Sequence, residues 1–293
     1  MTRYNVSLNA IYLNMPEEVM ATESWVVTGP QIIEIEQLSR LRVQLVRGRV
    51  DVVAHDDPAE RGARIEVHSV DGRPLEIVLA GGELRVGYSY TLDGWENFLD
   101  KFRNFRDKDT ADVHVAVPRD VAVKLGTVSA EGLLAGLAED AAVSTVSGSM
   151  VTDSTRGALS ANTVSGELVV RSHRGDLRIN TVSGDVTASG DLTRVTANAL
   201  SGAVALDVTS ESSSLSVSTV AGDVTVRLPE GRGLTVEART VAGRVVVDGQ
   251  QRSGSTPGQT TVDLRTEDGS CFVSCSTVSG GLTVLRDTPR QAS

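Results

Sequence analysis

The stretch Thr163 to Asn180 reads TVSGELVVRSHRGDLRIN, and its opening tetrapeptide, Thr-Val-Ser-Gly, returns eighteen residues later at Thr181. The same tetrapeptide lies eighteen residues earlier at Thr145. Related tetrapeptides begin at Thr127, Ala199, Thr219, Thr240 and Thr277. A fixed period near twenty residues indicates structural units that stack on one another, so the sequence predicts a solenoid.

Each repeat has the pattern of β-strands. Leu168 and Val170 are two residues apart, and so are Leu177 and Ile179, with polar residues around them. This period of two is the strand signal, because a helix would place apolar residues three and four apart. Ser-Gly pairs such as Ser165-Gly166 mark the sharp bends between strands, because glycine permits the backbone angles that such bends need. One repeat is therefore read as strand, bend, strand, bend.

Three columns of similar residues favour parallel stacking over an array of antiparallel hairpins, because residues align in the same chain direction. The first column is Val146, Val164, Val182, Leu200, Val220, Val241 and Val278. The second is Met150, Leu168, Val186, Val204, Val224, Val245 and Leu282. The third is Val143, Ala161, Ile179, Ala197, Val217, Ala238 and Cys275. We expect an all-β fold, a single-stranded parallel β-helix of about 18–20 residues per coil, with all three columns inside.

A corner is expected between the third column and the first. Ile179 and Val182 are three residues apart, so both face inward only if the chain bends at Asn180-Thr181. Asn162, Asn180 and Asn198 recur at this place, and stacked asparagines exchange amide hydrogen bonds along the axis. The pattern predicts an asparagine ladder at this corner, and a severe effect of Val182→Asp.

Four segments organise the chain. Residues 1–24 form an N-terminal extension, 25–118 a β-rich N-terminal part or cap, 119–287 the β-helix repeats and 288–293 a tail. The cap is expected because a solenoid end exposes unpaired strand edges. Its predicted strands are Ile32–Ile35, Leu41–Val46, Val50–Ala54, Ile65–Val70, Leu75–Leu79, Leu84–Tyr88 and Val113–Val117.

One short helix is predicted near residues 95–107. Its apolar residues follow helical spacing: Trp95, Phe98, Leu99, Phe102 and Phe105. They would pack on the cap, form an interaction face for a partner or second copy, or insert into a membrane surface. The nearby Lys101 and Arg103 favour a membrane, whereas acidic neighbours such as Glu96 and Asp100 offset their charge.

Composition restricts the classes of partner. The net charge is −10 and the pI is about 5.0, so nucleic acid is not an expected partner. Aromatic residues make up 3% of the chain, and Phe272 is the only one after residue 121, whereas carbohydrate and base sites use aromatic platforms. Apolar runs of membrane-spanning length and a secretion signal are absent from the sequence, which predicts a cytoplasmic protein.

The repeats resemble a known bacterial family. The Thr-Val-Ser-Gly-Asp-Val pattern at Thr181 to Val186 and Thr219 to Val224 is similar to the β-strand-repeat family called "putative adhesin", a domain of unknown function. The strand and proline at Asp112 to Pro118, and the segment Leu41 to Asp57, resemble its entry and N-terminal strands. The resemblance spans about residues 30–287. It implies a single-stranded β-helix without known enzymatic activity, in a family often linked to envelope stress.

The residues with reactive side chains do not form a recognisable catalytic or metal-binding motif in the sequence. Glu167, Asp185 and Asp223 share a column that could bind a cation, but other repeats place Ser149, Ala203 and Arg244 there. The four histidines, His55, His68, His114 and His173, lack ligand spacing. Cys271 and Cys275 are too far apart on one strand for a disulfide and are expected to be buried, since Cys275 belongs to the third column.

We therefore expect a non-catalytic solenoid that acts as an interaction or assembly scaffold, with neither cofactor nor small-molecule substrate. Its partner would be another protein or a second copy. The alternatives are a carbohydrate-active β-helix enzyme, which would need convergent acids in a groove, and a membrane-surface stress component that uses the segment at 95–107.

Overall fold

The computed structural model describes residues 22–57, 61–89, 109–231, 233–252, 260–265 and 269–287. Within these ranges every regular element is a strand. The strands are β1 (Glu23–Val27), β2 (Gln31–Ile35), β3 (Arg40–Leu45), β4 (Arg47–His55), β5 (Ala63–Asp71), β6 (Leu75–Ala80), β7 (Glu83–Gly87), β8 (Thr110–Pro118), β9 (Ala122–Thr127), β10 (Glu131–Ala135), β11 (Ala141–Thr145), β12 (Met150–Asp153), β13 (Arg156–Thr163), β14 (Leu168–Thr181), β15 (Val186–Ser201), β16 (Val204–Val208), β17 (Ser213–Ala221), β18 (Val224–Pro229), β19 (Leu234–Thr240), β20 (Val245–Val247), β21 (Gln250–Arg252), β22 (Thr260–Arg265), β23 (Cys271–Thr277) and β24 (Leu282–Asp287).

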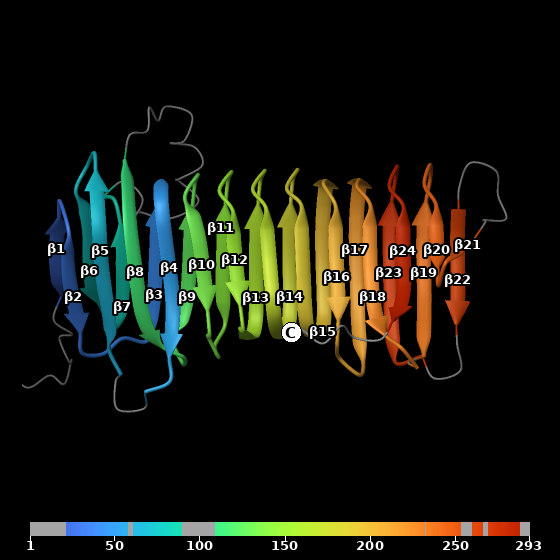
Figure 1. Ribbon diagram of the computed structural model, residues 1–293, viewed down its shortest axis with the longest axis horizontal. Helices are drawn as coiled ribbons and strands as arrows, with labels where there is room; N and C mark the ends of the chain where they lie inside the picture. Colours follow the sequence, from blue (N-terminus) through green and yellow to red (C-terminus); the bar gives the residue numbers. More distant parts are fainter. Residues whose placement is uncertain are drawn as a thin grey trace, which may run out of the picture.

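The molecule is an elongated, solenoid-like stack of coils, each of which gives one strand to each of two rows (Figure 1). In the repeat region neighbouring coils pair in parallel, and the register equals the sequence period. Val143 pairs with Ala161, Ala161 with Ile179 and Ile179 with Ala197. The all-β, solenoid-like architecture expected from the repeats is confirmed.

The order of coils in space differs from their order in the sequence at both ends of the stack. Near the C-terminus, β23 and β24 pair in parallel with β17 and β18 on one side, and with β19 and β20 on the other. Near the N-terminus, β3 and β4 lie between β7 and β8 on one side and β9 and β10 on the other. The repeat at Thr277 thus lies between those at Thr219 and Thr240, which corrects the sequential order read from the columns.

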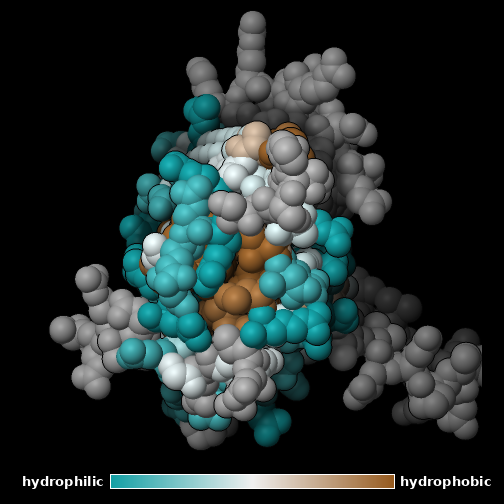
Figure 2. Space-filling model, turned by 90° about the vertical axis from the view of Figure 1, so that its right-hand side faces the viewer, coloured by the Kyte–Doolittle hydropathy of each residue, from teal (hydrophilic) through white to brown (hydrophobic). Residues whose placement is uncertain are grey.

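Antiparallel strands complete both ends. At the N-terminal end, β6 and β1 extend one row and β5 and β2 the other, each pairing antiparallel with its neighbour. At the C-terminal end, β22 pairs antiparallel with β19, and β21 with β20. Figure 2 looks onto this end and shows that the interior between the two rows is apolar, with hydrophilic side chains around it.

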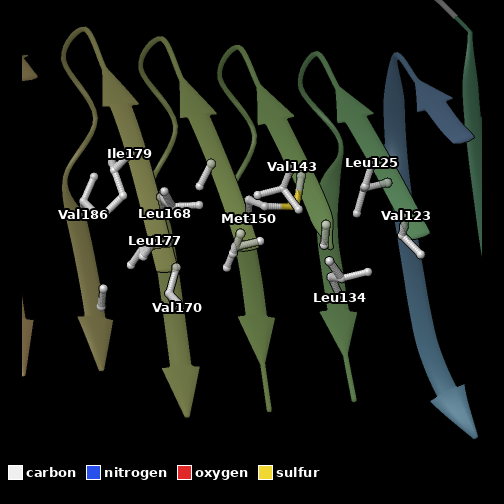
Figure 3. Packing of buried hydrophobic residues seen from close by; sticks show 14 of the residues in the cluster. Val123, Leu125, Leu134, Val143, Met150, Leu168, Val170, Leu177, Ile179 and Val186 are labelled. Carbon is white, nitrogen blue, oxygen red and sulfur yellow. The ribbon is translucent and has the colours of Figure 1, made fainter. Parts of the chain in front are cut away.

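The core is built from two of the predicted columns. Every residue of the second and third columns is buried, as Figure 3 shows for Met150, Leu168, Val186, Val143 and Ile179. Both columns project into the space between the two rows, where each side chain contacts its counterparts above and below. Their inward placement, including that of Cys275, is confirmed, and Cys271 is buried as well. Both thiols are free, and burial raises the pKa of Cys275 to about 11.

The first column points outward from Val164 onward, contrary to the expectation, whereas its first member, Val146, is half-buried against the core. Val182 is 44% exposed, and Val164, Leu200, Val220, Val241 and Val278 are exposed to a similar extent. The strand continues without a bend through Asn180, so the threonine of the tetrapeptide, two residues after Ile179, faces inward with it. The bend follows this threonine and turns the next residue to the surface. The predicted core position of Val182 is therefore wrong.

The residues Trp95, Phe98, Leu99, Phe102 and Phe105 of the predicted short helix lie outside the described residues. This segment joins β7 to β8 and is therefore an excursion between the two strands of one coil. The seven strands expected before the repeats all occur, within a few residues of their predicted ends. Helices able to cross a membrane are absent from the described ranges.

Candidate functional site: the outward ladder at the tetrapeptide corner

Threonine, the first residue of the tetrapeptide, closes the corner from inside. In the coil that begins at Thr163, its Oγ1 donates to the carbonyl oxygen of Gly166 at 2.9 Å and accepts from the Gly166 N–H at 3.0 Å. Thr181 makes the same two bonds to Gly184. The hydroxyl satisfies two buried backbone groups at once, which explains a polar residue in the interior.

Serine and glycine, the third and fourth residues, join neighbouring coils. Ser183 Oγ donates to the carbonyl oxygen of Val164 in the preceding coil at 3.1 Å, and Ser165 does the same to Val146. Glycine is required because the coils approach closely here. A Cβ on Gly166 would lie 2.1 Å from the carbonyl oxygen of Gly148. Three of the four residues therefore have a role inside the solenoid.

The second residue has no such role and forms a continuous apolar stripe on the surface. We call this stripe the valine ladder; in spatial order it consists of Val164, Val182, Leu200, Val220, Val278 and Val241. Adjacent coils lie about 4.8 Å apart, so the six side chains extend over about 24 Å. Single exposed apolar residues are ordinary on proteins, whereas a contiguous row marks an interaction surface.

An asparagine ladder borders the valine ladder on one side. Asn180 Nδ2 donates to Asn162 Oδ1 at 2.9 Å, and Asn198 Nδ2 donates to Asn180 Oδ1 at 3.0 Å. These bonds confirm the predicted stacking, although the asparagines lie within strands and do not form the bend itself. Each amide keeps one N–H for a further partner.

An acidic column of Glu167, Asp185 and Asp223 borders the other side. Asp185 Oδ1 accepts from the Ala203 N–H at 2.8 Å, and Asp223 Oδ1 accepts from the Gly281 N–H at 2.8 Å. These aspartates thus bind the backbone of the next coil. Groups of three or more metal-ligating side chains do not occur among the residues that the structure describes.

A shallow hollow of about 310 Å³ lies between the asparagine and valine ladders. Its lining includes Asn180, Asn198, Leu200 and Val220. The coil here has Ala199 where the others have threonine, so the corner loses its hydroxyl bridge, and Gly202 takes a φ of 109°. The local departure from the motif therefore coincides with both the hollow and the largest ladder side chain.

A second hollow, of about 610 Å³, lies on the outer face of the row that contains β3, β9, β11 and β13. Its three carboxylates all have partners. Glu83 pairs with Arg85 at 3.0 Å, Asp140 accepts from the Ala158 N–H at 2.9 Å, and Asp176 pairs with Arg194 at 2.9 Å. All three carboxylates at this hollow thus contact neighbouring residues.

His173 is the histidine with a defined buried position. Its Nδ1 lies 2.9 Å from Thr155 Oγ1, and its Nε2 lies 3.3 Å from the carbonyl oxygen of Asp176. Since a carbonyl only accepts, Nε2 carries the proton and Nδ1 accepts from the threonine. Burial lowers the pKa of this imidazole below its usual 6.5, although the neighbouring Asp176 partly opposes the shift.

This burial predicts that acid destabilises the protein through His173. The neutral ring is favoured in the folded state, so its contribution is complete above pH 6.5 and is lost as the pH falls below that value. His173→Gln keeps a polar side chain but cannot titrate. Melting temperatures from pH 8 to pH 5 should fall more steeply for the wild type than for the variant. Parallel curves would contradict the assignment.

Comparison with known proteins agrees with the fold. The model of the family described as Toastrack DUF4097 matches residues 102–284. No curated protein matches the chain.

Solved structures of similar architecture exist at low sequence identity. A putative lipid binding protein from Parabacteroides distasonis is 11% identical, with a TM-score of 0.50 over 88% of this chain and 97% of that one. A putative adhesin from the same species is 12% identical, with a TM-score of 0.45 over 90% and 97%. A putative cell adhesion protein from Clostridium sporogenes is 12% identical, with a TM-score of 0.30 over 88% and 100%. The family match covers more than half of the chain, so the protein belongs to the Toastrack DUF4097 family.

Proposed function

We propose that this protein is a non-catalytic interaction scaffold, a single-stranded parallel β-helix that presents the valine ladder to a protein partner. One observation carries the proposal: the tetrapeptide repeats an exposed branched apolar residue at its second position, while its other three residues are engaged within the solenoid. An exposed valine does not improve the packing of its own coil. Its recurrence is explained when another surface covers it.

The use of polar groups in the repeats supports a scaffold over an enzyme. Hydroxyls such as those of Thr181 and Ser183, the asparagine amides and the carboxylates Asp185 and Asp223 form hydrogen bonds within or between coils. The polar side chains of the repeat thus serve to hold the coils together. What it offers outward at regular spacing is apolar surface, which suits binding and not proton transfer.

A protein partner suits the ladder better than a membrane surface does. Membrane-surface segments combine apolar and aromatic residues with lysine or arginine. The valine ladder instead adjoins Glu167, Asp185 and Asp223, which anionic lipid headgroups would repel. Arginines flank only its last coil, at Arg239 and Arg244. Beside the other five coils the opposite flank is uncharged and consists of Asn162, Asn180, Asn198, Ser218 and Ser276.

A photo-crosslinking amino acid placed at Val182 tests the proposal in cells that make the protein. Crosslinks to a polypeptide, either a second copy or another protein, are expected at Val182. The matched control is Thr187, which is exposed on the opposite row of the same coil and should give few. Equal crosslinking at the two positions, or crosslinks from Val182 to lipid alone, would refute the scaffold function.

A further inference from the structure

The valine ladder has its largest side chain next to a hollow. Leu200 is 53% exposed and lines the hollow of about 310 Å³ together with Asn180, Asn198 and Val220. The hollow lies only on the asparagine side of the ladder. The surface therefore carries a ridge and a depression side by side, and both run along the solenoid axis.

We propose that the partner of the valine ladder is a second copy of this chain, packed parallel to the first about a two-fold axis that runs along the solenoid. This inference rests on the proposed scaffold function and specifies its partner. In the dimer each ladder lies against the asparagine flank of the other copy, and Leu200 of each copy enters the hollow of its neighbour.

The spacing of the ladder favours a second copy over a partner of another architecture. Two identical ladders share the same rise of about 4.8 Å, so all six side chains meet equivalent positions. A helix has a pitch of about 5.4 Å, and over five steps it would drift by about 3 Å relative to the ladder. Only a solenoid of equal rise stays in register along the whole length.

The flanks of the ladder select the parallel arrangement. A contact between two identical surfaces can place the rods either parallel or antiparallel. In the antiparallel case each flank faces its own kind, so both hollows lie on the same side of the contact, where neither ladder enters them. In the parallel case the copies can shift sideways. Each ladder then fills the other's hollow, and the two acidic columns lie on opposite rims. Unfilled space disfavours the first arrangement.

The state of association gives the first test. Light scattering after size exclusion should show a dimer for the wild type, and Leu200→Glu should give a monomer because two carboxylates would enter the contact. Ile32→Glu is the matched control, since Ile32 is 56% exposed but lies on β2 at the N-terminal end. Both variants should keep the circular dichroism spectrum of the folded wild type. A monomeric wild type at 100 μM or so, or a dimer that Leu200→Glu leaves intact, would overturn the inference.

The direction of the two copies is tested with cysteines at one end of the ladder. In the parallel dimer Val164 of each copy lies at the same height as Asn162 of the other and faces it, so a mixture of Val164→Cys and Asn162→Cys chains should form a disulfide between copies under mild oxidation. In an antiparallel dimer they would lie about 24 Å apart, and no such bond would form. The native Cys271 and Cys275 are buried and should not interfere. A dimer without this disulfide would overturn the parallel arrangement.

The outcomes separate this inference from the proposed function. If Val182 crosslinks to a different protein while the purified chain remains monomeric, the scaffold function stands and the second copy is excluded. If neither crosslinks nor a dimer occur, both fall. If the purified chain is a dimer through Leu200 and the Val164→Cys and Asn162→Cys chains form their mixed disulfide, both are supported.

Discussion

Replacing Val186 with aspartate is expected to unfold the protein or nearly so, whereas the same replacement at Val182 should leave its stability almost unchanged. Val186 is 1% exposed and stacks between Leu168 and Val204. An aspartate there would lose the apolar contact and bury an unpaired carboxylate, at a cost of more than about 4 kcal/mol. That is a large part of the 5–15 kcal/mol or so that stabilises a typical domain.

Val182 provides the control in the same coil. It is 44% exposed, so its aspartate remains in water and should change the free energy of unfolding by no more than about 0.5 kcal/mol. Chemical denaturation of both variants, with monomer and dimer states checked beforehand, measures the difference. Comparable destabilisation by the two substitutions would contradict the outward direction of the valine ladder.

Replacing Gly166 with alanine is expected to be among the most damaging single-methyl changes in the repeats. The added Cβ would lie 2.1 Å from the carbonyl oxygen of Gly148 and 3.0 Å from its carbonyl carbon. Both contacts are with backbone, so relief requires two coils to separate where Ser165 holds them together. We expect a loss of at least about 3 kcal/mol.

Gly29→Ala is the matched substitution, because a Cβ at Gly29 has nothing within 4 Å. It should alter the melting temperature little, whereas Gly166→Ala should lower it by many degrees. Equal melting temperatures for the two variants would mean that the coils are not in close contact at the tetrapeptide corner.

The repeat period predicts the stacking but not the direction of every side chain. Strand alternation correctly placed Ile179 and Leu168 inside, because each lies within a strand where successive residues alternate faces. At a corner the alternation is interrupted. Counting residues across the corner therefore does not tell which side chains face inward. Val182 was assigned to the core by placing the bend at Asn180-Thr181, and the bend lies after Thr181.

One signal in the sequence could have located the bend. Thr181 is two residues after Ile179, so strand alternation places both on the same face. In nearly every repeat a glycine follows three residues after this threonine position. A threonine hydroxyl bridging to that glycine explains both the inward polar residue and the outward valine. The hydrogen bond of the threonine determines that Thr181 faces inward, whereas hydrophobicity alone would place Val182 there.

The order of the coils could not be read from the columns because the coils are alike. Val220, Val241 and Val278 belong to repeats that fit one another equally well, so similarity does not state which two are neighbours. The long interval between Thr240 and Thr277 indicates an excursion, and β21 and β22 occupy it. β23 lies between β17 and β19 because the chain folds back between two coils, and the repeat pattern does not show this return.

The place of β23 and β24 has a consequence for how the chain is made. As it leaves the ribosome, each coil from β9 through β18 can add to a coil that has already been made. β19 and β20 are synthesised next, yet the strands that join them to the stack, β23 and β24, are synthesised later. The solenoid can close only after β24 has been synthesised, by a step with high sequence separation that is slow compared with local pairing. A nascent chain stalled before Cys271 would expose the edges of both β17 and β19, which makes premature termination a risk for aggregation.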